Sequence, residues 1–169
     1  MALLSIQNLT TTFQAAEGTV KACDRVSLEI PAGKTVGLIG ETGCGKSVLG
    51  MSVLRLLSSR ALIKGEIFYK GEDLLAMDAD RLRRLRGKEI ALLPQSPSTS
   101  LNPVLKVGFQ IAEGLHLHRK TRWGKAWQKA VAMLDSLKLP EPAKRAQEYP
   151  HQLSGGMKQR ALAAASITG

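Results

Sequence analysis

The 169-residue sequence predicts an α/β fold with an N-terminal antiparallel β region and a helical subdomain inserted later. Two extended stretches with alternating apolar residues occupy most of positions 3–31. A short apolar run at 35–40, bounded by glycines, then precedes a segment whose apolar residues recur at helical spacing. From residue 104 to about residue 148 the spacing is again mostly helical.

The composition is that of a globular domain, with 44% hydrophobic and 22% charged residues. No apolar run reaches the roughly 18 residues of a membrane span, and the start "MALLSIQNLTTTF" lacks the features of a signal peptide. Cys23 and Cys44 form neither a disulfide framework nor a CxxC motif, which fits a reducing cytosol. The net charge of +10 is spread over several segments, which favours a solvated surface and no nucleic-acid partner.

In the first half of the chain, each expected element has its own pattern. Residues 3–13 and 20–31 predict two strands, and the second ends at the turn "PAGK". The continuous apolar runs 35–40 and 89–95 predict strands that are buried on both faces. The remaining two elements are a helix over 46–57 and a hairpin that turns at Lys70 and Gly71.

The second half is helical after a loop at 96–103 that is rich in Ser, Pro and Asn. Breaks in the helical spacing fall near 119–122 and at 139–142. Pro150 precedes the last element, a helix that we expect to begin at Ser154.

Residues 40–47, "GETGCGKS", match the phosphate-loop pattern G-x-x-x-x-G-K-[ST]. Gly43 and Gly45 let successive backbone N–H groups point at one anion. Lys46 brings a positive charge to the β- and γ-phosphates, and Ser47 offers a hydroxyl to Mg²⁺. The pattern predicts a P-loop NTPase, against the alternative of a glycine-rich turn that binds nothing. The predicted binding residues are Gly40, Glu41, Thr42, Gly43, Cys44, Gly45, Lys46, Ser47 and Val48.

Two further segments carry a family resemblance. "ALLPQSPSTSLNP" (91–103) places Gln95 after an apolar run, and "YPHQLSGGMKQR" (149–160) carries the sequence LSGG. A phosphate loop, a glutamine loop and LSGG, in that order, resemble the ATP-binding cassette of ABC transporters. The stretches "GETGCGKSV" and "SLNPVLKVGFQIAEGL" are most similar to the oligopeptide, dipeptide and nickel importer branch, and the resemblance covers essentially the whole chain.

The resemblance implies roles for further residues. Phe13 lies where the family places an aromatic side chain against adenine, although a core position in a strand would also explain it. Gln95 would reach Mg²⁺ or the attacking water. The predicted catalytic residues are therefore Lys46 and Gln95, and the predicted Mg²⁺ ligands are Ser47 and Gln95. Ser154, Gly155 and Gly156 would complete the ATP site of a second subunit; an ordinary helix cap is the alternative.

The resemblance also implies a function. The chain would be the ATP- and Mg²⁺-binding subunit of an importer for peptides, nickel or a related small solute. Its partners would be a second cassette paired head to tail, transmembrane permease subunits and, indirectly, an extracytoplasmic solute-binding protein. It would lie on the cytoplasmic face of the inner membrane. The expected parts are 1–97 (β subdomain and phosphate-loop core), 98–152 (helical subdomain) and 153–169 (signature motif and a helix returning to the core).

In the family, a strand ending in Asp-Glu and a switch histidine follow the last helix seen here. The sequence stops at Gly169, before either of them. We therefore expect the C-terminal part of the core sheet to be missing, the strand at 35–40 to have an unpaired edge, and hydrolysis by the isolated chain to be impaired. Two alternatives stay open, a non-catalytic or vestigial docking partner of the membrane subunits and a non-transport ABC ATPase.

Overall fold

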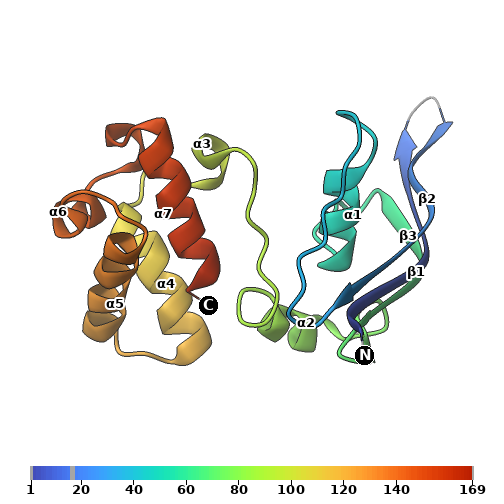
Figure 1. The fold of residues 1–169 in the computed structure, drawn as a ribbon, viewed down its shortest axis with the longest axis horizontal. Helices are drawn as coiled ribbons and strands as arrows, with labels where there is room; N and C mark the ends of the chain where they lie inside the picture. The colour runs from blue at the N-terminus through green and yellow to red at the C-terminus, as the bar shows by residue number, and fades with distance from the viewer. Residues whose placement is uncertain (1, 16–17, 169) are drawn as a thin grey trace. The chain divides into compact units, whose positions relative to one another are not determined.

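The computed structural model describes residues 2–15 and 18–168, which form two compact units, Met1–Arg83 and Arg84–Gly169. The first unit is a β-sheet with one helix against it, and the second is a cluster of helices (Figure 1). Helix α2 (Ala79–Leu85) spans the boundary between the units. Within the described ranges, no helix is long and apolar enough to cross a membrane.

The sheet of the first unit has four antiparallel strands in the order β2-β1-β3-β4. The long strands of the predicted β region pair through their apolar positions, and Ile6 lies opposite both Leu28 and Ile67. The turn of the predicted hairpin is formed by Lys70 and Gly71, whose φ angles of 51° and 84° suit the tight turns that join two strands. The strands are β1 (Ala2–Ala15), β2 (Gly18–Pro31), β3 (Ala61–Tyr69) and β4 (Glu72–Asp73).

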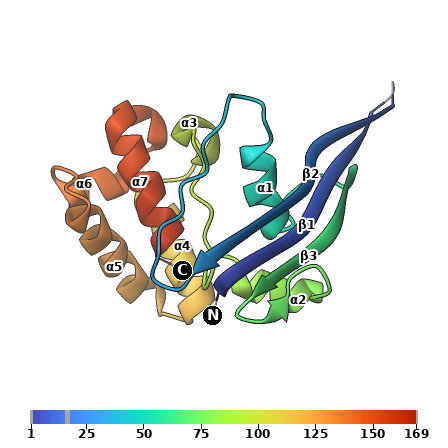
Figure 2. The ribbon, with the colours of Figure 1, turned by 45° about the vertical axis from the view of Figure 1, so that its right-hand side comes forward.

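Helix α1 (Lys46–Val53) lies along one face of this sheet, against β1 and β2 (Figure 2). Its apolar side chains Leu49 and Val53 are buried, as the helical spacing predicted. A buried hydrogen bond of 3.0 Å joins the hydroxyls of Thr11 on β1 and Ser52 on α1. The regular helix ends four residues before the predicted end at residue 57, and the sheet fixes the orientation of its N-terminus.

The two predicted buried strands at 35–40 and 89–95 are wrong for this structure. Residues 35–40 have no regular structure, and Ile39 is 96% exposed. Residues 89–95 form no strand either: Ile90 makes an isolated bridge with Arg86, the other backbone hydrogen bonds of Glu89 and Ile90 belong to a local turn, and Leu93 is 57% exposed. A strand needs a hydrogen-bonded partner strand, and the described residues supply none for either run. Both runs are apolar, but an apolar run cannot form a hydrogen-bonded ladder without partner strands.

The second unit packs its helices around one apolar core. The helix breaks predicted near 119–122 and 139–142 are confirmed, and the predicted loop at 96–103 contains one short helix. Helix α7 shares the core with α4 and α5, through small side chains such as Ala161 and Ala164 that allow close packing. The elements are α3 (Pro97–Ser100), α4 (Val107–Arg119), α5 (Trp123–Ser136), α6 (Pro142–Gln147), the 3₁₀ turn η1 (Pro150–Gln152) and α7 (Gly155–Ile167).

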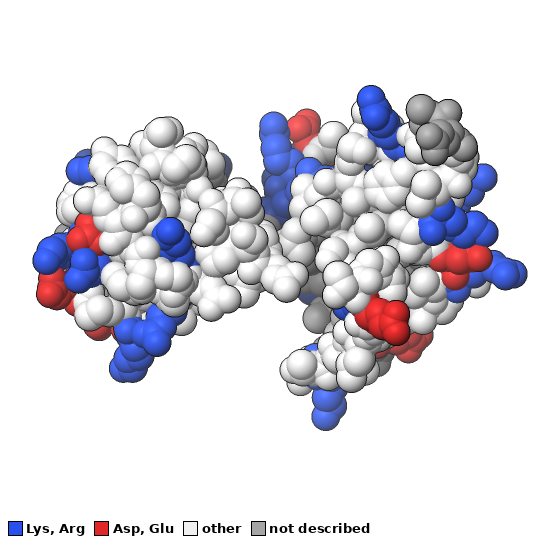
Figure 3. All heavy atoms as spheres, turned by 90° about the horizontal axis from the view of Figure 1, so that it is seen from above, with Lys and Arg blue, Asp and Glu red and all other residues white. Residues whose placement is uncertain are grey.

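Charged side chains are distributed over both units. On the face drawn in Figure 3, Lys and Arg side chains lie in separate small groups with Asp and Glu among them. The exposed ion pairs, such as Arg83 with Asp80 at 3.0 Å, each contribute little to stability because solvent screens them. This distribution is typical of a solvated surface.

Candidate functional site

The phosphate loop ends in a backbone conformation that needs glycine. Gly43 has φ 87° and Gly45 has φ 96°, a region that side chains with a Cβ rarely adopt. Gly45 is the N-cap of α1, and no side chain caps this helix. Because Leu49 N–H is the first to bond back, to Gly45 O at 2.9 Å, the N–H groups before it are not used within the helix. The loop therefore presents several free donors at a helix N-terminus, which is an anion-binding arrangement.

Gly45 is also held tightly against β2. A Cβ at this position would collide with the carbonyl oxygen of Ala22. The thiol of Cys23, next along β2, donates to Gly45 O at 3.7 Å. Burial raises the pKa of the Cys23 thiol, and a hydrogen bond with Thr11 only partly offsets it, so this thiol stays neutral at physiological pH. The sheet thus positions the end of the loop through direct backbone contact.

Lys46 closes the loop from the inside. Its ammonium donates to the carbonyl oxygens of Gly40, at 2.7 Å, and Glu41, at 2.6 Å, and lies 3.3 Å from the Cys44 sulfur. The first turn of α1 carries no acidic residue that would neutralise the positive end of the helix dipole. The ammonium and the helix dipole together favour an anion with several negative charges.

Ser47 is exposed on the first turn of α1. Its hydroxyl suits Mg²⁺, which prefers oxygen ligands and takes most of them from bound phosphates and water. The described residues contain no group of three or more His, Cys, Asp or Glu that could hold a metal by itself. A metal ion here would therefore share its ligands with a phosphate compound, which fits this donor set.

Phe13 lies on β1 in the same unit as the loop. It pairs with Val20 on β2 and Ala61 on β3, and its side chain is half-buried. Two residues before it on β1, Thr11 pairs with Cys23, and Cys23 contacts the end of the loop. Phe13 is thus near this end of the sheet and keeps part of its ring exposed, so its contact with a base stays a prediction.

The other two predicted site segments lie in the second unit. Gln95 is exposed in a bend before α3, and its catalytic role stays a prediction. Ser154 caps α7 as expected, and its hydroxyl accepts a hydrogen bond from Met157 N–H at 3.4 Å. Gly155 and Gly156 are exposed, and a Cβ on either would meet nothing within 4 Å. The start of α7 therefore presents unused N–H groups to open space.

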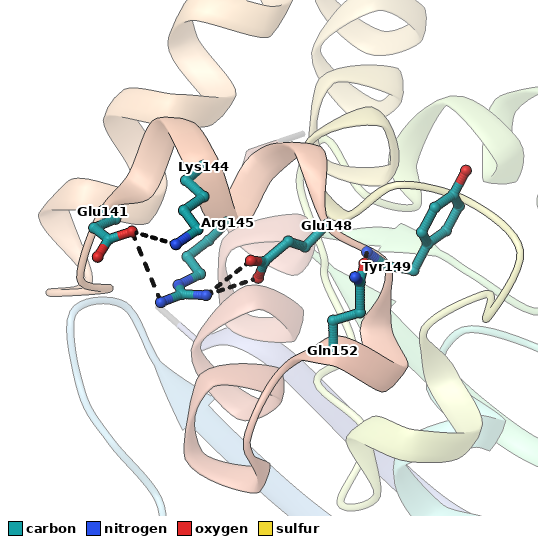
Figure 4. Close-up of polar contacts among 6 residues, drawn as sticks. All are labelled: Glu141, Lys144, Arg145, Glu148, Tyr149 and Gln152. Atoms are coloured by element: carbon teal, nitrogen blue, oxygen red, sulfur yellow. Dashed lines mark hydrogen bonds and ion pairs between the residues drawn. The ribbon is translucent and has the colours of Figure 1, made fainter.

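A group of polar contacts lies in the residues just before α7 (Figure 4). The sequence motifs did not predict it. The Arg145 guanidinium binds both carboxylate oxygens of Glu148, at 2.8 and 3.0 Å. Tyr149 N–H donates to the side-chain oxygen of Gln152 at 2.8 Å, and Gln152 N–H donates to Tyr149 O at 3.0 Å. The signal available in the sequence was a Gln at the third position of a turn opened by proline, which is a capping pattern.

Comparison with known proteins gives related sequences over nearly the whole chain. Residues 23–169 match the family model described as ABC transporter. A putative peptide import ATP-binding protein of Brucella abortus (strain 2308) is 44% identical over 168 residues, which are 99% of this chain and 51% of the relative. The oligopeptide transport ATP-binding protein OppD of Escherichia coli (strain K12) is 38% identical over 166 residues, which are 98% and 49%. The chain spans about half the length of the curated relatives it matches.

Solved structures of an ABC transporter cassette also match this chain. The dimeric structure of the bacterial ABC transporter cassette MJ0796 matches with a TM-score of 0.85 at 25% identity, over 98% of this chain and 69% of that chain. A post-hydrolysis state of that cassette bound to ADP and Pi matches equally well, with the same TM-score, identity and coverage. The predicted fold, that of an ABC ATPase, is thereby confirmed. The chain belongs to the ABC transporter family, as an ATP-binding cassette sequence.

Proposed function

We propose that this chain forms the nucleotide-binding part of an ABC importer subunit that couples binding and hydrolysis of ATP to solute uptake. The observation that carries this proposal is the phosphate loop, in which the Lys46 ammonium is held by the loop carbonyls and the N-terminus of α1 has no side-chain cap. In this role, Lys46 binds the β- and γ-phosphates, and Ser47 contributes a ligand to Mg²⁺. Mg²⁺ held with the help of Ser47 would neutralise negative charge on the phosphates during hydrolysis.

The paired arrangement follows from the second N–H surface. Ser154, Gly155 and Gly156 present a helix N-terminus to open space and contain no basic side chain. Such a surface favours the γ-phosphate of a nucleotide that is held by the phosphate loop of a neighbouring cassette. The dimer of the cassette MJ0796 supports this arrangement. Gln95 is proposed to contact Mg²⁺ or to orient the attacking water, and Phe13 to contact the adenine.

The solute is proposed to be a peptide rather than nickel. The relatives with 38–44% identity quoted above are named as peptide import or oligopeptide transport proteins. The cassette would lie on the cytoplasmic face of the membrane, where the helical segment 98–152 docks on permease subunits. An extracytoplasmic binding protein would deliver the peptide to those subunits.

Uptake in cells tests this proposal. Cells that lack the gene are supplied with a radiolabelled short peptide or with radioactive nickel, and the gene is returned either intact or with Lys46→Ala. We expect peptide uptake to fall to background without the gene, to return with the intact gene, and to stay at background with the variant. Nickel uptake is expected to be the same in all strains. Normal peptide uptake in the deletion strain would contradict the proposed function.

A further inference from the structure

The N-terminus of α7 is positioned by a short, closed turn. Leu153 is buried in the core of the second unit, and the next residue, Ser154, is the exposed cap of the helix. The segment before them, residues 148–152, sets the direction from which the chain enters the helix. Because Gly155 and Gly156 have no side chains to anchor them, the direction of their N–H groups depends on that entry.

The first half of this turn is fixed to the rest of the unit. Glu148 O accepts a hydrogen bond from Val107 N–H, at the start of α4, at 2.9 Å. Its carboxylate is held by Arg145 in two hydrogen bonds, and both side chains are largely buried, with 16% and 21% exposed. An Arg–carboxylate pair with two hydrogen bonds to one partner fixes geometry as well as charge. Residue 148 is therefore a fixed point about six residues before the cap.

The second half of the turn is closed by two backbone hydrogen bonds and by one exposed side chain, that of Gln152. Gln152 Oε1 accepts from Tyr149 N–H at 2.8 Å, while Gln152 N–H donates to Tyr149 O at 3.0 Å. Leu153 N–H then donates to Pro150 O at 3.2 Å. The Gln152 side chain is exposed and does not contribute to the core, so its removal takes away one of the three hydrogen bonds of the turn and loosens it without leaving a cavity.

We propose that Gln152 is a positioning residue for the phosphate-binding surface at Ser154, Gly155 and Gly156. This inference rests on the proposed function, in which that surface completes the nucleotide site of a neighbouring cassette. Gln152 acts through the backbone of Tyr149 and does not itself contact nucleotide. A small displacement of oriented N–H donors is enough to weaken a transition-state contact strongly.

The test uses the full-length protein in its paired form, with Gln152→Ala as the main variant. We expect ATP turnover to fall about 10-fold or more, because the donors at α7 lose their alignment. The affinity of the isolated subunit for ATP is expected to be unchanged, since its own phosphate loop is not altered. The thermal midpoint is expected to shift by less than about 5 °C, because one exposed hydrogen bond is lost.

Rescue and control variants separate positioning from general damage. Gln152→Glu keeps an oxygen that accepts from Tyr149 N–H, so turnover is expected to return to within about threefold of the wild type. Gln128→Ala on α5 removes another exposed glutamine, outside the turn, and should have no effect. Amide hydrogen exchange should be faster at residues 149–157 in Gln152→Ala alone.

The proposal is overturned if Gln152→Ala matches Gln128→Ala in turnover and exchange, or if Gln152→Glu is as impaired as Gln152→Ala. It is also overturned if turnover falls only in proportion to a large loss of thermal stability. Failure of the proposed function has a different signature: the wild-type protein would neither bind nor hydrolyse ATP.

Discussion

Full-length protein carrying Gly45→Ala is expected to lose at least about 100-fold in affinity for MgATP, a loss of roughly 2.7 kcal/mol. Alanine is strained at the φ of 96° found here, by about 1–3 kcal/mol. The added Cβ also collides with the carbonyl oxygen of Ala22, which belongs to the sheet and cannot move aside easily. The loop must therefore shift, and its N–H groups lose their common direction. Equilibrium titration with a fluorescent ATP analogue measures the affinity.

Gly50→Ala is the matched control for this variant. Gly50 lies in the same helix as Lys46, and a Cβ there would meet nothing within 4 Å. We expect unchanged affinity for MgATP and a slightly more stable protein, by up to about 1 kcal/mol, because alanine favours the helix. Equal affinities for the two variants would show that the glycine conformation at residue 45 does not shape the site.

Gly156→Asp is expected to lower ATP turnover by the paired cassettes about 100-fold or more. The new carboxylate would lie in the open space before α7, where the model of a shared site places the γ-phosphate of the neighbouring subunit. Two negative groups repel each other there. The same carboxylate stabilises the helix, by about 0.3–1 kcal/mol, because it is near the positive end of the helix dipole. Gly156→Asp should thus raise the stability of the protein while it lowers ATP turnover.

The chain offers a close control for this charge. Gly124 is the second residue of α5, just as Gly156 is the second residue of α7, and a Cβ there also meets nothing within 4 Å. Gly124→Asp should stabilise the protein to a similar extent and leave turnover unchanged. Steady-state ATPase assays and thermal unfolding of both variants measure the two effects. Equal turnover in Gly156→Asp and Gly124→Asp would argue against a shared nucleotide site.

Local sequence signals predicted the parts of the fold that depend on neighbours close in the chain. The hairpin at Lys70 and Gly71 needs only a two-residue turn between strands that pair directly, and the glycine supplies one of its two positive φ angles. The residue at which α7 begins was predicted from its cap, Ser154, alone. The apolar runs at 35–40 and 89–95 are different, since apolar character predicts a buried strand only if partner strands exist. Among the described residues neither run has a partner strand, and Ile39 is exposed.

Some residues of the candidate site could likewise be predicted from local sequence, and others could not. The glycines and Lys46 of the phosphate loop were predicted because their chemistry is fixed by a spacing of eight residues. The role of Gln152 was missed, because it depends on a turn closed over Tyr149 and on the buried pair Arg145 and Glu148. A side chain that works through another residue's backbone leaves only a weak pattern in the sequence. Its geometry has to be read from the fold.

Whether the phosphate loop binds a nucleotide is decided by the affinity of the full-length protein for MgATP, measured for the wild type and for Lys46→Ala. Lys46 is the cation that donates to the carbonyls of Gly40 and Glu41, and we propose that it exchanges them for phosphate oxygens. We expect Lys46→Ala to lose about 100-fold in affinity, and Lys64→Ala on β3 to be indistinguishable from the wild type. Unchanged affinity in Lys46→Ala would show that this loop is not a phosphate site.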